Sequence, residues 1–410
     1  MRRFFGLLLL ATAAWAQGDF YLKDGDRVVF YGDSITDQRL YTTFTESFVL
    51  TRFPRMRVTF VHSGWGGDRV SGGAGGPIDV RLPRDVFAYK PTVLTIMLGM
   101  NDGSYRAFNP EIFERFSSGF ESIVHSLKQA LPDVRITAIQ PSPYDDVTRP
   151  PTFAGGYNAV LLRYGKFLAE LAERENLTLA DLNTPVVAAL KKAKSLDPEL
   201  ALKLLPDRVH PGPGGHLLMA EALLKAWHAP GLVTSVEIDA DTKQVTAENT
   251  KVSSLEAGAG LSWTQEDAAL PMPIDKKDAP LALALRASDF TEALNRQPLK
   301  IAGLTRARYV LRIDGEYAGS FSRQDLADGV NLAVLPTPMA QQALDVHALT
   351  IRHTQIHNAR WRQVQVPMQD QKLERLQPAL DSLDALDAEL IEQQRTAAQP
   401  KPRRYELSPE

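Results

Sequence analysis

The chain has 410 residues, of which 44% are hydrophobic and 23% charged, and its formal net charge is −3. These fractions are those of a folded globular protein with room for two domains, and they exclude disorder over most of the chain. Because acidic and basic residues are interspersed and nearly balanced, nucleic acid is not an expected partner, since it would require a concentrated basic face.

The first residues carry the pattern of a secretory signal peptide. Arg2 and Arg3 precede an apolar run that is too short to cross a bilayer as a helix, and an Ala-Trp-Ala sequence then offers a cleavage site. We therefore expect residues 1–16 to be removed and the mature chain to be periplasmic or secreted, without stable membrane insertion. An N-terminal anchor helix is the alternative. The absence of cysteine excludes a lipid-attachment cysteine and disulfides.

Residues 17–230 alternate between β-rich apolar runs and helical patterns. Most runs are continuous rather than alternating, as in parallel strands that are covered on both faces. Strands are expected at 28–31, 58–62, 93–98, 134–139 and 177–182, and helices at 40–52, 83–89, 110–131, 156–175, 185–202 and 214–227. This order predicts a doubly wound three-layer α/β/α sandwich, with functional groups beyond the carboxyl ends of its strands.

After Pro230 the alternation of strand and helix patterns ends. Strand-like segments occur at 233–238, 244–252 and 307–313, and Asp314-Gly315 predicts a tight β-hairpin returning through 317–321. Residues 258–282 are expected to form a loop. Two helices are expected at 337–363 and 369–394, and they complete a C-terminal accessory region, residues 231–396. The proline-containing tail, residues 397–410, is expected to be disordered.

A leucine stripe runs along the second of these helices. We expect it to pack on its own domain, with a dimerising coiled coil as the alternative. The oligomeric state is left open.

Four short segments that are far apart in the sequence follow predicted strand ends or precede a helix. They are GDSIT at 32–36, GWGGD at 64–68, GMND at 99–102 and DRVH at 207–210. A serine nucleophile needs a base, which His210 can supply while Asp207 orients its ring, and Ser34 sits at a helix start that favours an anion. The backbone N–H groups of Ser34 and Gly67 and the Asn101 amide can hold an oxyanion.

Each segment also has a purely structural interpretation. Ser34 can cap a helix, the glycines at 64–67 can form a turn, and Asn101 can cap a helix or form an Asx-turn. An Asp-x-x-His pair such as Asp207 and His210 is common in surface turns. The catalytic interpretation rests on the presence of all four segments in this order.

These residues resemble the GDSL, or SGNH, serine hydrolases, which are named for Ser, Gly, Asn and His in four blocks. Ser34, Gly67, Asn101 and His210 match these blocks, and Asp207 matches the acid of the triad. The resemblance covers roughly residues 27–228. It implies a flavodoxin-like α/β/α fold and ester hydrolysis through an acyl-enzyme, without cofactor or metal. The second block is looser, which leaves Gly64 as an alternative oxyanion donor.

Other residues beside the blocks are candidates for substrate contact. They are Asp33, Trp65 and Asp102, and Tyr105 also follows a block directly. Trp65 is placed where an exposed ring can stack on a sugar, with packing in the core as the alternative. His353 and His357 have a helical spacing that can bind a metal, but the sequence suggests no third ligand, so we expect packing or surface roles.

The main functional hypothesis is a secreted serine esterase whose substrate is a small-molecule or polysaccharide ester. The polar neighbours of the blocks and the absence of a long apolar lid favour a carbohydrate acetyl esterase. A lysophospholipase or general short-chain esterase is the enzymatic alternative. A non-catalytic module that binds glycan or protein is the alternative from another class.

Overall fold

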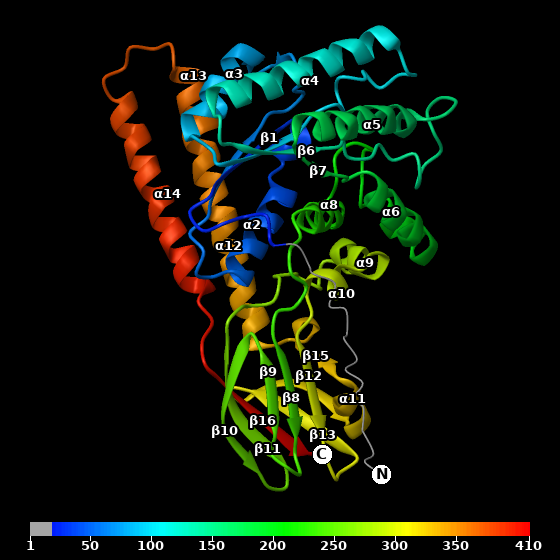
Figure 1. Cartoon of the computed structure of the whole chain (residues 1–410), viewed down its shortest axis with the longest axis vertical. Helices are drawn as coiled ribbons and strands as arrows, with labels where there is room; N and C mark the ends of the chain where they lie inside the picture. Colours follow the sequence, from blue (N-terminus) through cyan, green and yellow to red (C-terminus); the bar gives the residue numbers. More distant parts are fainter. Residues whose placement is uncertain (1–18) are drawn as a thin grey trace, which may run out of the picture.

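The central sheet of the α/β part has five strands in the order β2-β1-β5-β6-β7 (Figure 1). They are β1 (Arg27–Gly32), β2 (Thr59–Gly64), β5 (Val93–Met97), β6 (Arg135–Ile139) and β7 (Thr178–Ala180). All neighbours pair in parallel. The apolar runs are almost entirely buried because helices cover both faces. The predicted strands and the doubly wound fold are confirmed.

The structure, a computed structural model, describes residues 19–410, so the predicted signal peptide lies outside the described residues. In Figure 1, α4 and α5 lie above the sheet, and α2 and α8 lie below it. The helices of this part are α1 (Ser34–Asp37), α2 (Leu40–Arg52), α3 (Ile78–Asp85), α4 (Pro110–Ala130), α5 (Tyr157–Glu175), α6 (Thr184–Leu196), α7 (Pro198–Ala201) and α8 (Pro213–Ala226). A short 3-10 turn, η1 (Phe87–Tyr89), and a small ribbon, β3 (Gly72–Gly73) with β4 (Gly76–Pro77), complete it.

The helix α4 illustrates how local sequence sets these elements. The side chain of Asn109 accepts the backbone N–H of Ile112, and Pro110 occupies the first turn, where its missing N–H has no cost. Its buried residues recur at helical spacing and form one face, which packs into the core: Phe116, Phe120, Ile123, Val124 and Leu127.

The β-rich part contains two further sheets that enclose one core. One has the order β10-β11-β16-β13-β14, and the other has the order β15-β12-β8-β9. The strands are β8 (Ser235–Asp239), β9 (Val245–Glu248), β10 (Thr250–Ala257), β11 (Leu261–Asp267), β12 (Pro298–Ala302), β13 (Arg308–Ile313), β14 (Glu316–Ser322), β15 (Val330–Asn331) and β16 (Arg403–Pro409). The predicted hairpin at Asp314-Gly315 joins β13 to β14.

The expectation that residues 397–410 are disordered is wrong. Strand β16 lies between β11 and β13, in the middle of its sheet. Its alternate residues Tyr405 and Leu407 are buried, and the Tyr405 ring stacks on Trp263 with ring centroids 5.0 Å apart. Two of the prolines precede the strand and the third is its last residue, so none of them interrupts the pairing. The expected loop at 258–282 likewise contains β11.

Replacing Tyr405 with alanine should lower the free energy of unfolding of the β-rich part by about 3 kcal/mol, because it leaves a cavity beside Trp263. Chemical denaturation followed by tryptophan fluorescence measures this loss. The matched control is Arg404→Ala, whose side chain is exposed on the same strand. Equal stability of the two variants would contradict the structural role of the tail.

The boundary expected near Pro230 does not separate two independent cores. Helices α9 (Ala279–Ala287) and α10 (Phe290–Leu294) follow β11 in the chain, yet their apolar side chains belong to the core of the α/β part. Residues of the region 231–396 therefore complete the first core as well as build the second. The remaining short elements are α11 (Arg323–Asp328) and η2 (Leu332–Val334).

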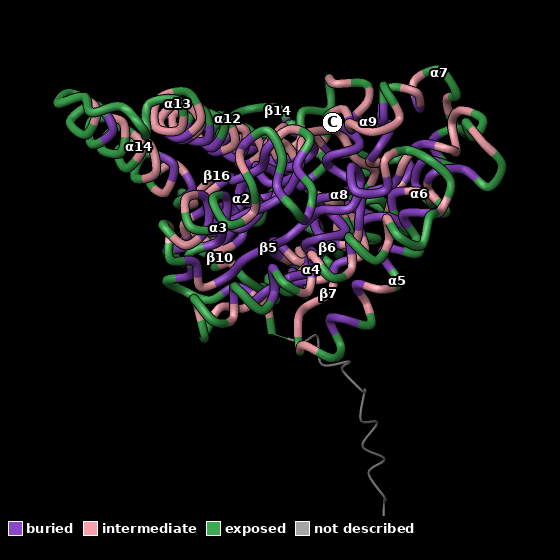
Figure 2. The backbone as a smooth tube through the Cα atoms, turned by 90° about the horizontal axis from the view of Figure 1, so that it is seen from above, coloured by how far each residue is buried: buried purple, intermediate pink, exposed green. Residues whose placement is uncertain are grey.

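A pair of long helices flanks the α/β part. Helix α12 (Pro338–Asn358) runs along α2, continues through the π-helical segment η3 (Ala359–Gln365) and α13 (Val366–Met368), and α14 (Leu376–Ala398) returns beside it (Figure 1). In Figure 2 the buried backbone fills the middle of the molecule, whereas α14 at the edge is mostly intermediate or exposed. Of the leucine stripe, Leu380 is buried, while Leu373 and Leu386 are exposed. No helix within residues 19–410 is both long and apolar enough to cross a membrane.

Candidate active site

The structure brings the three residues of the predicted triad together. The Ser34 hydroxyl lies 2.8 Å from Nε2 of His210, and Nδ1 of His210 lies 2.7 Å from Oδ2 of Asp207. Ser34 comes from the turn after β1, whereas Asp207 and His210 come from the loop before α8. A continuous line of hydrogen bonds therefore joins a hydroxyl, an imidazole and a carboxylate from distant parts of the sequence.

The Asp207 carboxylate is held by the turn that carries it. Its Oδ1 accepts the backbone N–H groups of Val209 and His210, at 3.0 and 2.7 Å, and the turn requires Arg208 to adopt a φ of 75°. Burial raises the pKa of Asp207, but the hydrogen bonds from the His210 ring and from these two N–H groups outweigh it and hold the pKa below its ordinary value. The ionised carboxylate keeps the proton on Nδ1, which leaves Nε2 free to accept the proton of Ser34.

The turn that carries Ser34 depends on two close backbone approaches. A Cβ atom on Gly32 would lie 2.3 Å from the Thr36 hydroxyl, and one on Gly64 would lie 2.2 Å from the backbone nitrogen of Asp37. The cap of α1 is Asp33, whose Oδ1 accepts the Ile35 N–H at 3.0 Å. Ser34 is therefore the first residue inside the helix, where its own N–H has no acceptor within the helix.

The Asn101 amide is oriented by two hydrogen bonds. Its Nδ2 donates to the carbonyl of Asp68 at 3.0 Å, and its Oδ1 accepts the Tyr105 hydroxyl at 2.8 Å. The second hydrogen of Nδ2 remains for an oxyanion. This contact also brings the second and third blocks together next to Gly67.

The two candidate glycines of the second block differ in their surroundings. Gly67 has a φ of 77°, and no atom lies within 4 Å of the position where a Cβ would be. Gly64, in contrast, packs against α1, as described above. The open surroundings of Gly67 suit a backbone donor that faces a substrate, and its role remains a prediction.

A buried ionic cluster, which the sequence did not suggest, supports the second block. The fully buried Arg81 of α3 donates to Oδ2 of Asp68 at 2.8 Å and also pairs with Asp85. Oδ1 of Asp85 in turn accepts the indole N–H of Trp361 at 2.6 Å, from the π-helical segment η3. The accessory helices thus connect, through Asp85 and Arg81, to the residue whose carbonyl holds Asn101.

The three predicted substrate contacts are not exposed. Asp33 caps α1 with 1% exposure, and Asp102 is 8% exposed and accepts the Val70 N–H. Trp65 is 7% exposed, and its ring is covered by the guanidinium groups of arginines from α3 and η3, so it does not offer a face to a sugar. Proximity to a motif in sequence does not reveal burial. Tyr105, at 42% exposure beside Asn101, is the exposed aromatic ring here.

The side chain of Gln38 holds the loop that carries His210. The Gln38 amide donates to the Pro211 carbonyl at 3.3 Å, and its Oε1 accepts Nε2–H of His216 at 3.1 Å. Nδ1 of His216 accepts the Tyr41 N–H at 3.2 Å. Burial, with a smaller effect of the nearby His210, lowers the pKa of His216 to about 3, so this ring is neutral and structural.

The buried carboxyl of Asp33 predicts a pH dependence of stability. Burial raises its pKa to about 7 against the opposing Ile35 N–H, with Asp102 and Asp68 adding to the rise. Between its ordinary pKa of 3.8 and this value the folded chain holds a proton that the unfolded chain has lost. Its contribution to stability is therefore full below pH 4 and declines by a few kcal/mol as the pH rises to about 7.

Asp33→Asn keeps the acceptor for the Ile35 N–H and removes this titration. The unfolding free energy of the variant, minus that of the wild type, should grow from pH 4 to pH 7 and then level off. Denaturant titrations across this range measure the difference, and a difference that does not vary with pH would contradict the assignment.

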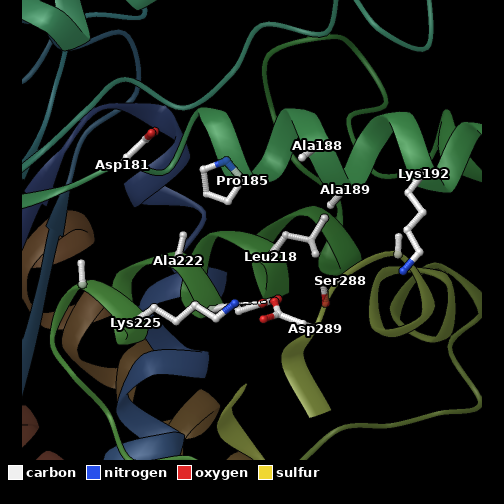
Figure 3. Close-up of a pocket in the computed structure, with 13 residues that line it drawn as sticks. Asp181, Pro185, Ala188, Ala189, Lys192, Leu218, Ala222, Lys225, Ser288 and Asp289 are labelled. Atoms are coloured by element: carbon white, nitrogen blue, oxygen red, sulfur yellow. Dashed lines mark hydrogen bonds and ion pairs between the residues drawn. The ribbon is translucent and has the colours of Figure 1, made fainter. Parts of the chain in front are cut away.

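The hollow in Figure 3 does not contain the triad. It has a volume of about 580 Å³ and lies between α6, α8 and the start of α10, where Lys225 pairs with Glu221 and Asp289. None of Ser34, Asp207 and His210 lines it. The His210 and Asp207 side chains are instead 38% and 57% exposed, so the triad opens directly to solvent.

Three comparisons relate this geometry to known proteins. Residues 30–218 match the model of the GDSL-like lipase/acylhydrolase family. An acetylxylan esterase of Geobacillus stearothermophilus is 25% identical over 226 residues, which cover 50% of this chain and 94% of that protein. The solved structure of a gut microbial diltiazem-metabolizing enzyme has a TM-score of 0.83 and 28% identity, and the match covers 95% of this chain and 98% of that one. The β-rich part and the helical pair therefore recur there with the α/β part.

Proposed function

We propose that this carboxylic ester hydrolase, whose α/β domain belongs to the GDSL-like lipase/acylhydrolase family, removes acetyl groups from carbohydrate esters through an acyl-enzyme on Ser34. The observation that carries the mechanism is the line of hydrogen bonds from Ser34 through His210 to Asp207. Such a line activates a hydroxyl that is otherwise a weak nucleophile at neutral pH.

The roles of the site residues then follow. Oγ of Ser34 attacks the ester carbonyl while Nε2 of His210 takes its proton, and the Asp207 carboxylate stabilises the resulting imidazolium. The N–H groups of Ser34 and Gly67 and the free hydrogen of the Asn101 amide hold the oxyanion. His210 gives its proton to the leaving alcohol. In deacylation it takes a proton from the attacking water and passes it to Oγ of Ser34 as the bond to the acetyl group breaks and acetate leaves.

The exposure of the triad and of Tyr105 supports a large polar alcohol, and the acetylxylan esterase relative supports an acetyl group. The exposed triad leaves the alcohol side of a substrate free to extend into solvent, as a polysaccharide chain must. The exposed ring of Tyr105 beside Asn101 offers a face for a sugar, and the acetylxylan esterase relative acts on such an ester. The predicted signal peptide fits a polymer outside the cell, so we propose a periplasmic or secreted location.

The oxyanion role of Asn101 predicts a defined kinetic loss. Asn101→Ala should lower kcat by about 10²–10³-fold, or about 3 kcal/mol of transition-state stabilisation, with a smaller change in KM, because the amide acts on charge that develops during reaction. Steady-state kinetics on nitrophenyl acetate measure this. An unchanged kcat would remove Asn101 from the oxyanion site.

The substrate is tested with nitrophenyl acetate, butyrate and octanoate, together with acetate release from acetylated xylan and pectin, for wild type and Ser34→Ala. The proposal expects Ser34-dependent activity that is confined to acetyl groups and includes release from polysaccharide. Activity that rises with chain length would replace it with a lysophospholipase or general esterase. Absence of Ser34-dependent turnover on every ester would indicate a binding module.

A further inference from the structure

A second cluster of polar side chains lies in the interior, away from the triad. Glu46 of α2, His62 of β2 and His353 of α12 each offer one ligand atom, and these atoms lie within 4.8 Å of one another. Oε2 of Glu46 lies 3.0 Å from Nε2 of His62, and Oε1 lies 3.7 Å from Nε2 of His353. All three side chains are at most 2% exposed.

The Nδ1 atom of each imidazole ring contacts an oxygen of a neighbouring side chain. Nδ1 of His62 lies 2.7 Å from the Thr42 hydroxyl, and Nδ1 of His353 lies 2.6 Å from Oδ1 of Asp387 on α14. These contacts turn both Nε2 atoms towards Glu46. A histidine that binds a metal is commonly oriented in this way, with an oxygen accepting its outer N–H.

One buried nitrogen of this cluster has no hydrogen-bond partner. Nε2 of His353 is buried and unpaired within the described part of the chain, and its distance to Glu46 is too long for a hydrogen bond. An unpaired polar atom in the interior is costly, which calls for an explanation. An ion between this nitrogen, His62 and the Glu46 carboxylate would supply the missing partner.

The charges of the cluster also favour a bound cation. Glu46 and Asp387 bring two carboxylates, whose charges a divalent cation would balance, and both imidazoles would coordinate this cation in their neutral form. The amide of Gln394 donates to Oε1 of Glu46 at 3.0 Å and to the Thr350 hydroxyl at 2.6 Å, which fixes the carboxylate in place.

The geometry points to a structural binding site for a zinc-like divalent cation formed by Glu46, His62 and His353. Imidazole and carboxylate ligands suit Zn²⁺, whereas Mg²⁺ and Ca²⁺ prefer all-oxygen sites. Ligand atoms at 2.0–2.1 Å from a tetrahedral ion lie about 3.4 Å apart. Here the two histidine nitrogens lie 3.0 and 3.7 Å from the two different oxygens of Glu46, and the three ligand atoms lie within 4.8 Å of one another. Because its ligands come from α2, β2 and α12, the ion would pin the helical pair to the α/β part.

Zinc binding by the purified full chain, after treatment with a chelator, tests this site directly. Calorimetric titration with Zn²⁺ and the visible absorption of Co²⁺ report binding, and thermal unfolding with and without Zn²⁺ reports its effect on stability. The first variant, His353→Gln, removes a ligand. The second, Asp387→Asn, keeps all three ligands and removes the negative charge of the side chain that contacts Nδ1 of His353. The matched control is His347→Gln, a histidine of the same helix that contacts Ser47 of α2 instead.

The wild type and the control should bind a single Zn²⁺ per chain and gain several degrees in Tm with it. His353→Gln should weaken binding by about 100-fold or more, and Asp387→Asn by about 10–100-fold. If His353→Gln does not fold, the Asp387→Asn result decides. Absence of stoichiometric binding to the wild type, or equal binding by wild type and both site variants, would overturn the proposal and indicate a proton-linked ion-pair cluster.

Discussion

Replacing Ser34 with alanine is expected to lower kcat for ester hydrolysis by a factor on the order of 10⁶, as loss of the nucleophile does in other serine hydrolases. The variant lacks the hydroxyl whose proton Nε2 of His210 is placed to accept, at 2.8 Å. The fold should be retained, since Asp33 rather than Ser34 caps α1.

Single-turnover and steady-state rates on nitrophenyl acetate, with the unfolding midpoint of each variant, measure these two effects separately. The matched control is Ser104→Ala, another partly buried serine in the turn after Asn101, whose hydroxyl contacts only a backbone carbonyl. The control should keep its rate within a few-fold. A Ser34→Ala variant that retains a substantial part of kcat would show that another group attacks the ester.

A large loss of stability is also expected on replacing Arg81, a buried residue outside the catalytic triad. Arg81→Met removes the positive charge between Asp68 and Asp85 and leaves the fully buried Asp68 carboxylate without its ion-pair partner, whereas Asp85 keeps Arg84. Removing one partner of a buried ion pair costs about 3–5 kcal/mol, because the remaining charge has lost its compensation. Activity should fall as well, since the Asp68 carbonyl positions the Asn101 amide.

Arg84→Met is the matched control for this loss. Arg84 also pairs with Asp85, at 2.7 Å, but its side chain is 10% exposed, and its removal leaves Arg81 in place to balance both carboxylates. Urea unfolding of the two variants should show a clearly larger loss for Arg81→Met. A loss below 1 kcal/mol for Arg81→Met would mean that the cluster does not hold the second block.

The features predicted correctly from the sequence are those with a local signal. The buried strands of the α/β sheet are continuous apolar runs, and Asp207 and His210 are separated by a single turn. The place of Ser34 follows from the strand that ends just before it. Each of these depends on a few neighbouring residues, so a pattern in one stretch was enough to suggest it.

The features that were missed depend on contacts between distant segments. Strand β16 looked like a proline-containing tail because its partners, β11 and β13, lie far away in the sequence. Trp361 contacts Asp85 across 276 positions, and the two side chains grouped with His353 come from β2 and α2, far away in the sequence. For Trp65 the sequence left open whether the ring is exposed or packed in the core, because no local pattern shows which side chains will cover it.

Covalent trapping shows whether His210 activates Ser34 as the nucleophile. The protein is incubated with a fluorophosphonate, an electrophile that labels activated serines, and the modified peptide is identified by mass spectrometry. A single phosphonyl group is expected on Ser34 in the wild type, with labelling strongly slowed in His210→Ala and absent in Ser34→Ala. Labelling of another serine, or an equal rate in His210→Ala, would contradict it.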